Sequence, residues 1–296
     1  MRCAMLALRS ALPLALLAAC IAPPPAAPTP SGEASMIDAN RRADAYLRGG
    51  DLEGAVRQYR EAIRVARTVE DTEGIAANAI NLSIVYQRMG RMEDARASLG
   101  LLLDRSPLVF SQDRMAQAAL RRAVLDMDER NASALEWLDR ASGYCGRGCS
   151  VSAAIQNVRG QLALDAGQPD QAAASARAAL AASRASGDRA EWANALRLLG
   201  AVAIRSGEAA SASGYLGEAL AIDRELALPR KIYLDLIALG RASALRGDRS
   251  AARSFYERAR AVSEADRDTA GAAQARALID ALGETVQARQ PSPGRP

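Results

Sequence analysis

The chain has 296 residues, of which 49% are hydrophobic, 24% are charged and only 4% are aromatic. This apolar fraction excludes disorder for most of the chain, and the scarcity of aromatic residues argues against a β-sandwich or barrel. Alanine is the commonest residue. Because Ala, Leu, Arg and Glu are strong helix formers, the composition predicts an all-α protein.

The chain contains no histidine, and its formal net charge is +4. The missing histidine excludes Ser-His-Asp and Cys-His nucleophilic sites, HExxH metalloproteases and His-ligated zinc or haem. Basic and acidic residues are interspersed, and no Lys/Arg run carries interleaved aromatic residues. We therefore expect no enzyme activity, no cofactor, no metal and no nucleic-acid partner.

The first 20 residues, MRCAMLALRSALPLALLAAC, have the pattern of an export signal. Arg2 and Arg9 make the segment positive, and an apolar run from Ala11 to Ala19 follows. This run is shorter than the roughly 20 apolar residues that a spanning helix needs. Residues 1–19 are therefore predicted to be a signal peptide rather than a membrane anchor.

The signal ends in Leu17-Ala18-Ala19-Cys20, which resembles the lipobox of bacterial lipoproteins. The resemblance implies diacylation of the Cys20 thiol and cleavage before this residue, so that acyl chains attach the protein to a bilayer. Ile21 stands where an Asp would favour the inner membrane, which resembles outer-membrane sorting and implies a chain that faces the periplasm. The alternative is an ordinary cleaved signal with a coincidental Cys.

Residues 20–35 are rich in Pro, followed by Gly and Ser, and are predicted to be a semi-extended tether.

The rest of the chain repeats itself at a period of about 40 residues. One small residue marks each copy: Ala55, Ala95, Ala134, Ala172, Ala212 and Ala252. Glycines five residues earlier mark a turn: Gly50, Gly90, Gly167, Gly207 and Gly247. A second small position lies twelve residues before the Ala: Ala43, Ser83, Gly160, Gly200 and Gly240.

These positions, together with Leu82, Leu199, Leu239, Tyr46 and Tyr86, resemble the tetratricopeptide repeat. The resemblance implies a right-handed superhelical α-solenoid of about six helical hairpins over residues 36–268. Residues 269–289 are predicted to be a capping helix, and residues 290–296 a disordered tail. The third copy departs from the pattern, since Glu129 occupies the turn position and Arg122 the small one.

Cys145 and Cys149 flank the segment Gly146-Arg147-Gly148 between the third and fourth hairpins. In an oxidising periplasm we expect them to form a structural disulfide. Free thiols, or a redox or metal role, are the alternatives, but the spacing is not that of a thioredoxin-like motif and two Cys without His make a poor zinc site.

The large aromatic residues Trp137, Trp192, Tyr215 and Tyr256 are interpreted as packing residues.

The family's ligand-facing positions, transferred to this sequence, imply a concave groove that binds peptide segments. The residues so implied are Asn40, Asp44, Arg48, Asn81, Gln87, Arg88, Asn157, Gln161, Asn194, Arg197, Arg205 and Arg241. Amides can pair with an extended backbone, and Arg can bind carboxylates. The same residues could instead form solvated helix faces. The family's Lys/Asn/Lys/Arg carboxylate clamp is not matched.

These features predict a membrane-anchored scaffold that binds other envelope proteins and assists assembly of a pilus or secretion machine, or adapts cell-wall enzymes. The alternative is a sensor that binds a peptide ligand and changes conformation.

Overall fold

The computed structural model describes residues 32–104, 106–146 and 148–287, so the predictions for residues 1–19, Cys20 and the tail 290–296 lie outside the described residues. The described residues form helices joined by short turns, with no strand among them. In chain order the helices are α1 (Gly32–Gly49), α2 (Leu52–Thr68), α3 (Thr72–Arg88), α4 (Met92–Leu103), α5 (Gln112–Asp128), α6 (Ser133–Tyr144), α7 (Ser152–Asp165), α8 (Pro169–Ser186), α9 (Arg189–Arg205), α10 (Ala209–Glu225), α11 (Pro229–Leu245), α12 (Arg249–Ala265) and α13 (Thr269–Gln287).

The turns within the hairpins depend on one left-handed residue each. Gly50, Gly90, Gly167, Gly207 and Gly247 all have φ between +72° and +81°, which L side chains rarely adopt. The third hairpin closes without glycine. There Arg130, the residue after Glu129, takes φ +56°.

Aspartates start several helices by accepting a backbone hydrogen bond from the first turn. Asp51, Asp71, Asp188, Asp248 and Asp268 each accept from the backbone N–H three residues later, at 2.7–3.0 Å. These bonds satisfy N–H groups that a helix cannot pair internally. Turn and cap together fix where one helix of the stack ends and the next begins.

The small positions let the two helices of a hairpin pack closely. The six repeat-marking alanines are all buried, none more than 2% exposed. A Cβ added to Gly200 in α9 would lie 2.6 Å from Leu216 Cγ in α10, and one on Gly240 would overlap the ring of Tyr256. The periodic small residues therefore set the spacing of the helices, while Leu and Tyr fill the adjacent space.

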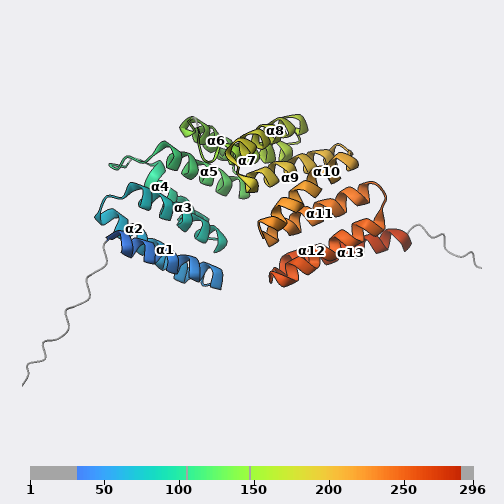
Figure 1. The fold of residues 1–296 in the computed structure, drawn as a ribbon, viewed down its shortest axis with the longest axis horizontal. Coiled ribbons are helices and arrows are strands. Elements are labelled where there is room, and N and C mark those ends of the chain that lie inside the picture. Colours follow the sequence, from blue (N-terminus) through green and yellow to red (C-terminus); the bar gives the residue numbers. More distant parts are fainter. Residues whose placement is uncertain (1–31, 105, 147, 288–296) are drawn as a thin grey trace, which may run out of the picture.

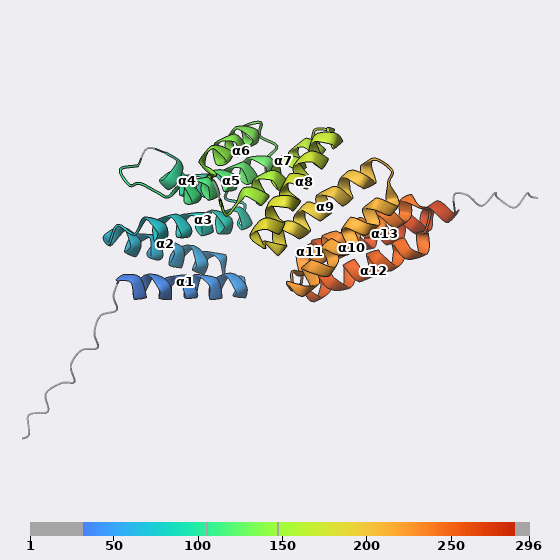
Figure 2. The ribbon, with the colours of Figure 1, turned by 45° about the horizontal axis from the view of Figure 1, so that its top comes forward.

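The stack curves into an arch, with α1 at one end and α12 and α13 at the other (Figure 1). From α1 to α11, each odd-numbered helix packs on the next odd-numbered helix, whereas the even-numbered helices pack mainly on their chain neighbours. The odd-numbered helices thus form the tighter, inner layer, and the view in Figure 2 shows the same succession.

Candidate functional site

A groove of about 740 Å³ lies on the inner side of the arch. Five successive odd-numbered helices line it, α5, α7, α9, α11 and α13. One part of the wall is apolar and is formed by Leu120, Val124, Met127, Ala154, Val158, Leu198, Ala201, Leu234, Ile237 and Ala238. The other part is polar and is formed by Asn157, Gln161, Glu191, Asn194, Arg197, Lys231, Tyr233, Arg241 and Gln274.

Arg197 of α9 is the centre of a buried ion cluster. Its Nε donates to Asp235 of α11 at 2.6 Å, and its Nη2 donates to Asp223 of α10. The two carboxylate side chains are 0% and 1% exposed. Burial, with a smaller contribution from neighbouring Asp223, raises the pKa of Asp235 to about 7 against the opposing effect of Arg197. A single guanidinium therefore holds two carboxyl groups from the last two hairpins.

Lys231 is the single lysine of the chain and extends into the groove from the first turn of α11. Its Nζ donates to Asn194 Oδ1 at 3.0 Å, and Arg197 donates to the same oxygen at 2.8 Å. The pKa of Lys231 is lowered, mainly by burial and secondly by the positive charge of Arg197. No carboxylate among the described residues lies in ion-pair contact with this ammonium.

Asn157 of α7 joins the groove to the next repeat. Its Nδ2 donates to the backbone oxygen of Glu191 at 3.0 Å and to the Glu191 carboxylate at 2.7 Å. Its Oδ1 is buried without a hydrogen-bond partner among the described residues. Gln161, one turn further on, donates to Asp165 at 2.9 Å.

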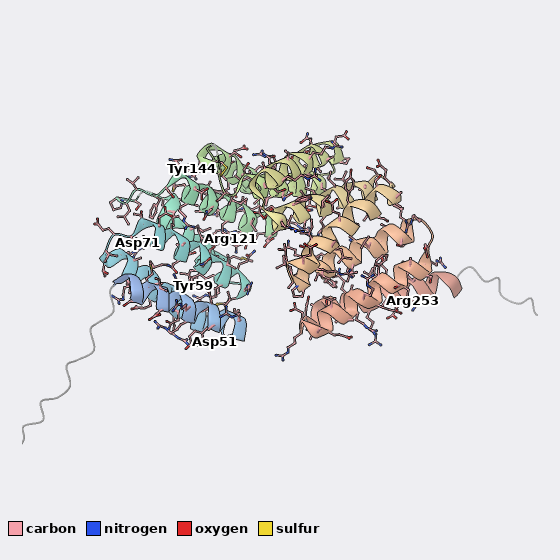
Figure 3. The ribbon with its side chains drawn as sticks, viewed as in Figure 1. Asp51, Tyr59, Asp71, Arg121, Tyr144 and Arg253 are labelled. Carbon is pink, nitrogen blue, oxygen red and sulfur yellow. A yellow bond between two sulfur atoms is a disulfide. The ribbon has the colours of Figure 1, made fainter. Side chains whose placement is uncertain are left out.

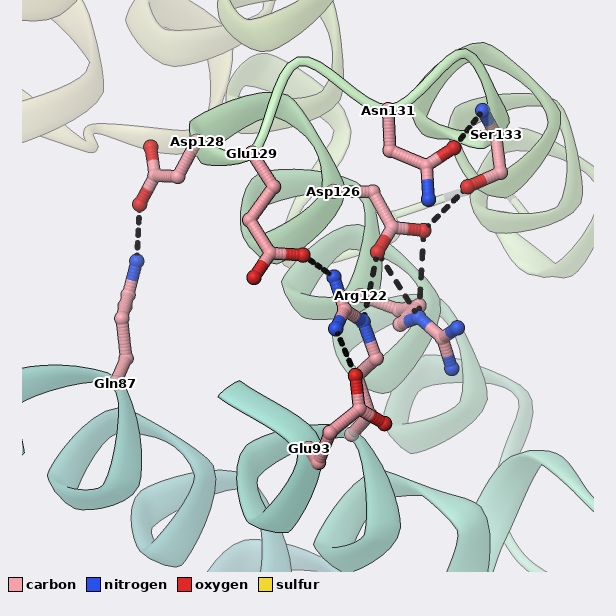
Figure 4. A network of polar contacts seen from close by, with 9 residues as sticks. Gln87, Glu93, Arg122, Asp126, Asp128, Glu129, Asn131 and Ser133 are labelled. Carbon is pink, nitrogen blue, oxygen red and sulfur yellow. Dashed lines mark hydrogen bonds and ion pairs between the residues drawn. The ribbon is translucent and has the colours of Figure 1, made fainter. Parts of the chain in front are cut away.

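Arg121 of α5 faces the N-terminal half of the arch, beside α3 (Figure 3). Its Nε donates to Ser83 Oγ at 3.1 Å, and its Nη2 donates to Gln87 Oε1. Burial lowers the pKa of Arg121 to about 10, against the opposing charge of Asp128. This guanidinium is held by neutral oxygens, while Gln87 in turn donates to Asp128 (Figure 4).

The contacts in Figure 4 around Arg96 and Asp126 join α4, α5 and α6 and do not line the groove. Arg96 Nε donates to the buried Asp126 at 3.0 Å, and Ser133 Oγ donates to the same carboxylate at 2.6 Å. Arg96 also pairs with Glu93 at 2.7 Å and with Glu129. Asp126 thus ties the third hairpin to the second.

The structure brings some of the residues implied by the repeat positions into the groove and leaves others elsewhere. Asn157, Gln161, Asn194, Arg197 and Arg241 line the groove. Asn40, Asp44, Arg48, Asn81, Gln87, Arg88 and Arg205 do not.

Several of the residues outside the groove have structural contacts of their own. Asp44 accepts from Tyr59 Oη at 2.9 Å; burial and this bond raise the tyrosine pKa to about 12. Arg205 donates to the backbone oxygen of Leu164. Asn40 Oδ1 is buried without a partner among the described residues.

Sequence reasoning missed Lys231, Glu191, Tyr233 and Gln274, as well as the apolar wall. A signal for some of these was available, because many polar contacts join residues about one period apart. Lys231 and Asn194 are 37 residues apart, and Tyr233 and Gln274 are 41 apart. A search for polar pairs at the repeat spacing would have found them.

The two cysteines and the four large aromatic residues also have definite places. Cys145 and Cys149 form a disulfide between α6 and α7. Tyr256 is buried, and Trp137 and Trp192 are partly buried beneath arginine side chains. Tyr215 is 37% exposed, so its interpretation as a packing residue is wrong; it lies on the exposed face of α10, next to Gly214 and Glu218.

Two further observations concern the described residues alone. No helix among them is long and apolar enough to cross a membrane. No group of three or more His, Cys, Asp or Glu residues within them could hold a metal ion.

Comparison with known families identifies residues 35–105, which span α1 to α4, as tetratricopeptide repeat sequence. No curated protein matches the sequence. The family match assigns this N-terminal part of the chain to the tetratricopeptide repeat family, and the described residues as a whole have an all-α solenoid fold.

Solved structures with the same fold share little sequence with this chain. PilW, a type IV pilus biogenesis factor, is 17% identical, with a TM-score of 0.55 over 76% of this chain and 92% of its own. A Rap protein complexed with Competence and Sporulation Factor is 13% identical, with a TM-score of 0.56 over 88% of this chain and 78% of its own.

A STAND protein from Pyrococcus horikoshii with a tetratricopeptide repeat sensor is 17% identical, with a TM-score of 0.61. The match covers 85% of this chain but only 38% of that larger one. At these identities the likeness concerns the fold alone.

Proposed function

We propose that this protein is a scaffold lipoprotein, anchored through acylated Cys20 on the periplasmic side of the outer membrane, that binds segments of other envelope proteins in its groove. The observation that carries the binding role is the groove itself, a hollow of about 740 Å³ that four consecutive hairpins and helix α13 line with both apolar and polar side chains. Such a surface can hold an extended chain through apolar contacts and amide hydrogen bonds.

The biological setting belongs to the same proposal. The fold likeness to a type IV pilus biogenesis factor favours a role in assembling a pilus or secretion machine. Organisation of cell-wall enzymes is the other role that an anchored scaffold of this kind could fill.

The experiment is a pull-down from crosslinked envelopes with a matched pair of variants. Leu234 lies in the groove and Leu226 lies outside it, and both are 37% exposed. We expect wild type and Leu226→Asp to recover the same envelope proteins, and Leu234→Asp to lose them. Recovery of no envelope protein above an untagged control, or equal recovery by both variants, contradicts the proposal.

A ligand sensor is the second candidate, favoured by the likeness to a Rap protein in complex with Competence and Sporulation Factor. In a sensor, an occupied groove would change the curvature of the stack. Small-angle scattering before and after addition of periplasmic peptides measures this change. A constant radius of gyration contradicts the sensor.

A further inference from the structure

One face of α11 carries cations at both ends and apolar side chains between them. Lys231, Leu234, Ala238 and Arg241 are spaced three, four and three residues apart, which places them on one side of the helix. All four line the groove. We call these four residues the α11 stripe.

No carboxylate among the described residues lies within ion-pair distance of the Lys231 ammonium, although Glu191, Asp223 and Asp235 attract it from further away. The carboxylates nearest in the fold are already engaged, since Asp223 and Asp235 bind Arg197 and Glu191 accepts from Asn157. Within the described part of the chain, the hydrogen bond to Asn194 is the contact that holds Nζ. A partly buried cation without an ion pair carries a desolvation penalty that an incoming carboxylate would offset.

The second cation of the stripe is Arg241, whose side chain is exposed to the groove. No carboxylate among the described residues lies in ion-pair contact with it. Ten residues of helix separate it from Lys231, which corresponds to about 15 Å along the axis. An extended chain covers this distance in roughly four or five residues at ~3.3 Å each.

The part of the α11 stripe between these cations is apolar. Leu234 is 37% exposed in the middle of the stripe. Leu120, Val124 and Met127 of α5 line the same groove from another helix. A polar side chain placed between the cations would lose its water without gaining a partner, whereas an aliphatic one would bury apolar surface.

We propose that the α11 stripe binds an extended segment of a partner protein in which two acidic side chains, four or five residues apart, flank an aliphatic residue. One acidic group pairs with Lys231, the other pairs with Arg241, and the aliphatic side chain lies on Leu234. This inference rests on the proposed binding function of the groove and specifies the chemistry of its ligand.

The test uses two dye-labelled probes that differ only in charge, acetyl-Glu-Ala-Leu-Ala-Glu-amide and its counterpart with Gln in place of both Glu. Their binding to the full processed protein is measured by fluorescence anisotropy. We expect the acidic probe to bind at least about tenfold more tightly than the neutral one, which is the effect of one good ion pair.

Lys231→Gln and Arg241→Gln each bring this ratio towards one. Arg253→Gln serves as the control, because Arg253 is an exposed arginine of α12 outside the groove (Figure 3). Circular dichroism and binding of the neutral probe show that each variant is folded. Should Lys231→Gln fail to fold, Arg241→Gln alone decides.

Equal affinity of the two probes for wild type overturns the inference, as does an unchanged ratio in the folded variants. Absence of binding of the acidic probe up to about 1 mM also overturns it. These outcomes leave the scaffold proposal standing if Leu234→Asp still loses envelope proteins in the pull-down. Loss of that pull-down difference, by contrast, removes the proposed function itself.

Discussion

At the scale of single residues, the cluster around Arg197 makes stability depend on pH. The pKa of Asp235 is raised from its ordinary 3.8 to about 7 by burial and by Asp223. The folded protein therefore keeps a proton that the unfolded chain releases. The contribution of the Asp235 carboxyl to the free energy of unfolding is fully present below about pH 4 and is lost as the pH rises through about 7.

We predict that the free energy of unfolding of wild type falls between pH 5 and pH 7, with a slope approaching about 1 kcal/mol per pH unit. In Asp235→Asn this slope disappears, because the amide can accept from Arg197 and donate to Asp223 at any pH in this range. The chain has no histidine to mask the effect. Urea unfolding at a series of pH values measures it; a flat wild-type profile contradicts the assignment.

Residues such as Lys231 and Asp235 show where sequence reasoning ends. Asp235 is 38 residues from Arg197, and each looks like an ordinary surface charge of an amphipathic helix. Only the register between neighbouring repeats makes them partners. The repeat pattern predicts which helix carries them, but not which side chains meet between helices.

At the scale of the elements, the pattern of small residues predicted most of the hairpin geometry. The five glycines assigned to turns all adopt positive φ, and the glycines at the second small position are in close contact with the neighbouring helix. Both follow from chemistry that is local to one hairpin. The Arg130 turn could not be foreseen, because any residue can take this conformation at a cost of about 1–2 kcal/mol.

We predict that Gly200→Ala destabilises the protein by about 1–3 kcal/mol, since the new methyl group would lie against Leu216. Gly217→Ala in α10 is the matched control, because no atom lies within 4 Å of its added Cβ. Alanine there should stabilise by up to about 1 kcal/mol through helix propensity. Thermal and urea unfolding of both variants compare them, and equal effects would refute the close-packing role.

Helix α6 buries few residues and is followed directly by the Cys145–Cys149 disulfide. It buries only Ala134, Leu138 and Ala141, whereas α10 buries seven residues. We predict that the double variant Cys145→Ser/Cys149→Ser loses about 2 kcal/mol of loop-closure stabilisation. Hydrogen exchange of α6 amides should accelerate, with α10 amides as the internal control. Unchanged α6 exchange would show that the disulfide has no structural effect.

At the scale of the whole molecule, the arch was predictable because it is the sum of similar hairpins. Each unit buries one face only against the next, so period and hairpin pattern together imply a stack with a concave side. The location of the groove was not predictable. It lies along α5 to α13, and its position depends on side chains of several helices at once.

The proposed anchor belongs to this scale as well, since it would decide where the whole arch resides. We predict that Cys20→Ala releases the protein into the soluble periplasmic fraction, because the acyl chains would have no thiol to attach to. Fractionation of envelopes followed by immunoblotting measures the change. Retention of the variant with the membrane contradicts the lipoprotein assignment.

The Cys145–Cys149 disulfide between α6 and α7 also has a consequence for the order of events during maturation. Thiols stay reduced in a cytosol and pair after export. Export as proposed above would therefore carry the chain across the inner membrane with Cys145 and Cys149 still unpaired. The connection between α6 and α7 would then be cross-linked only in the compartment where the groove is proposed to bind its partners.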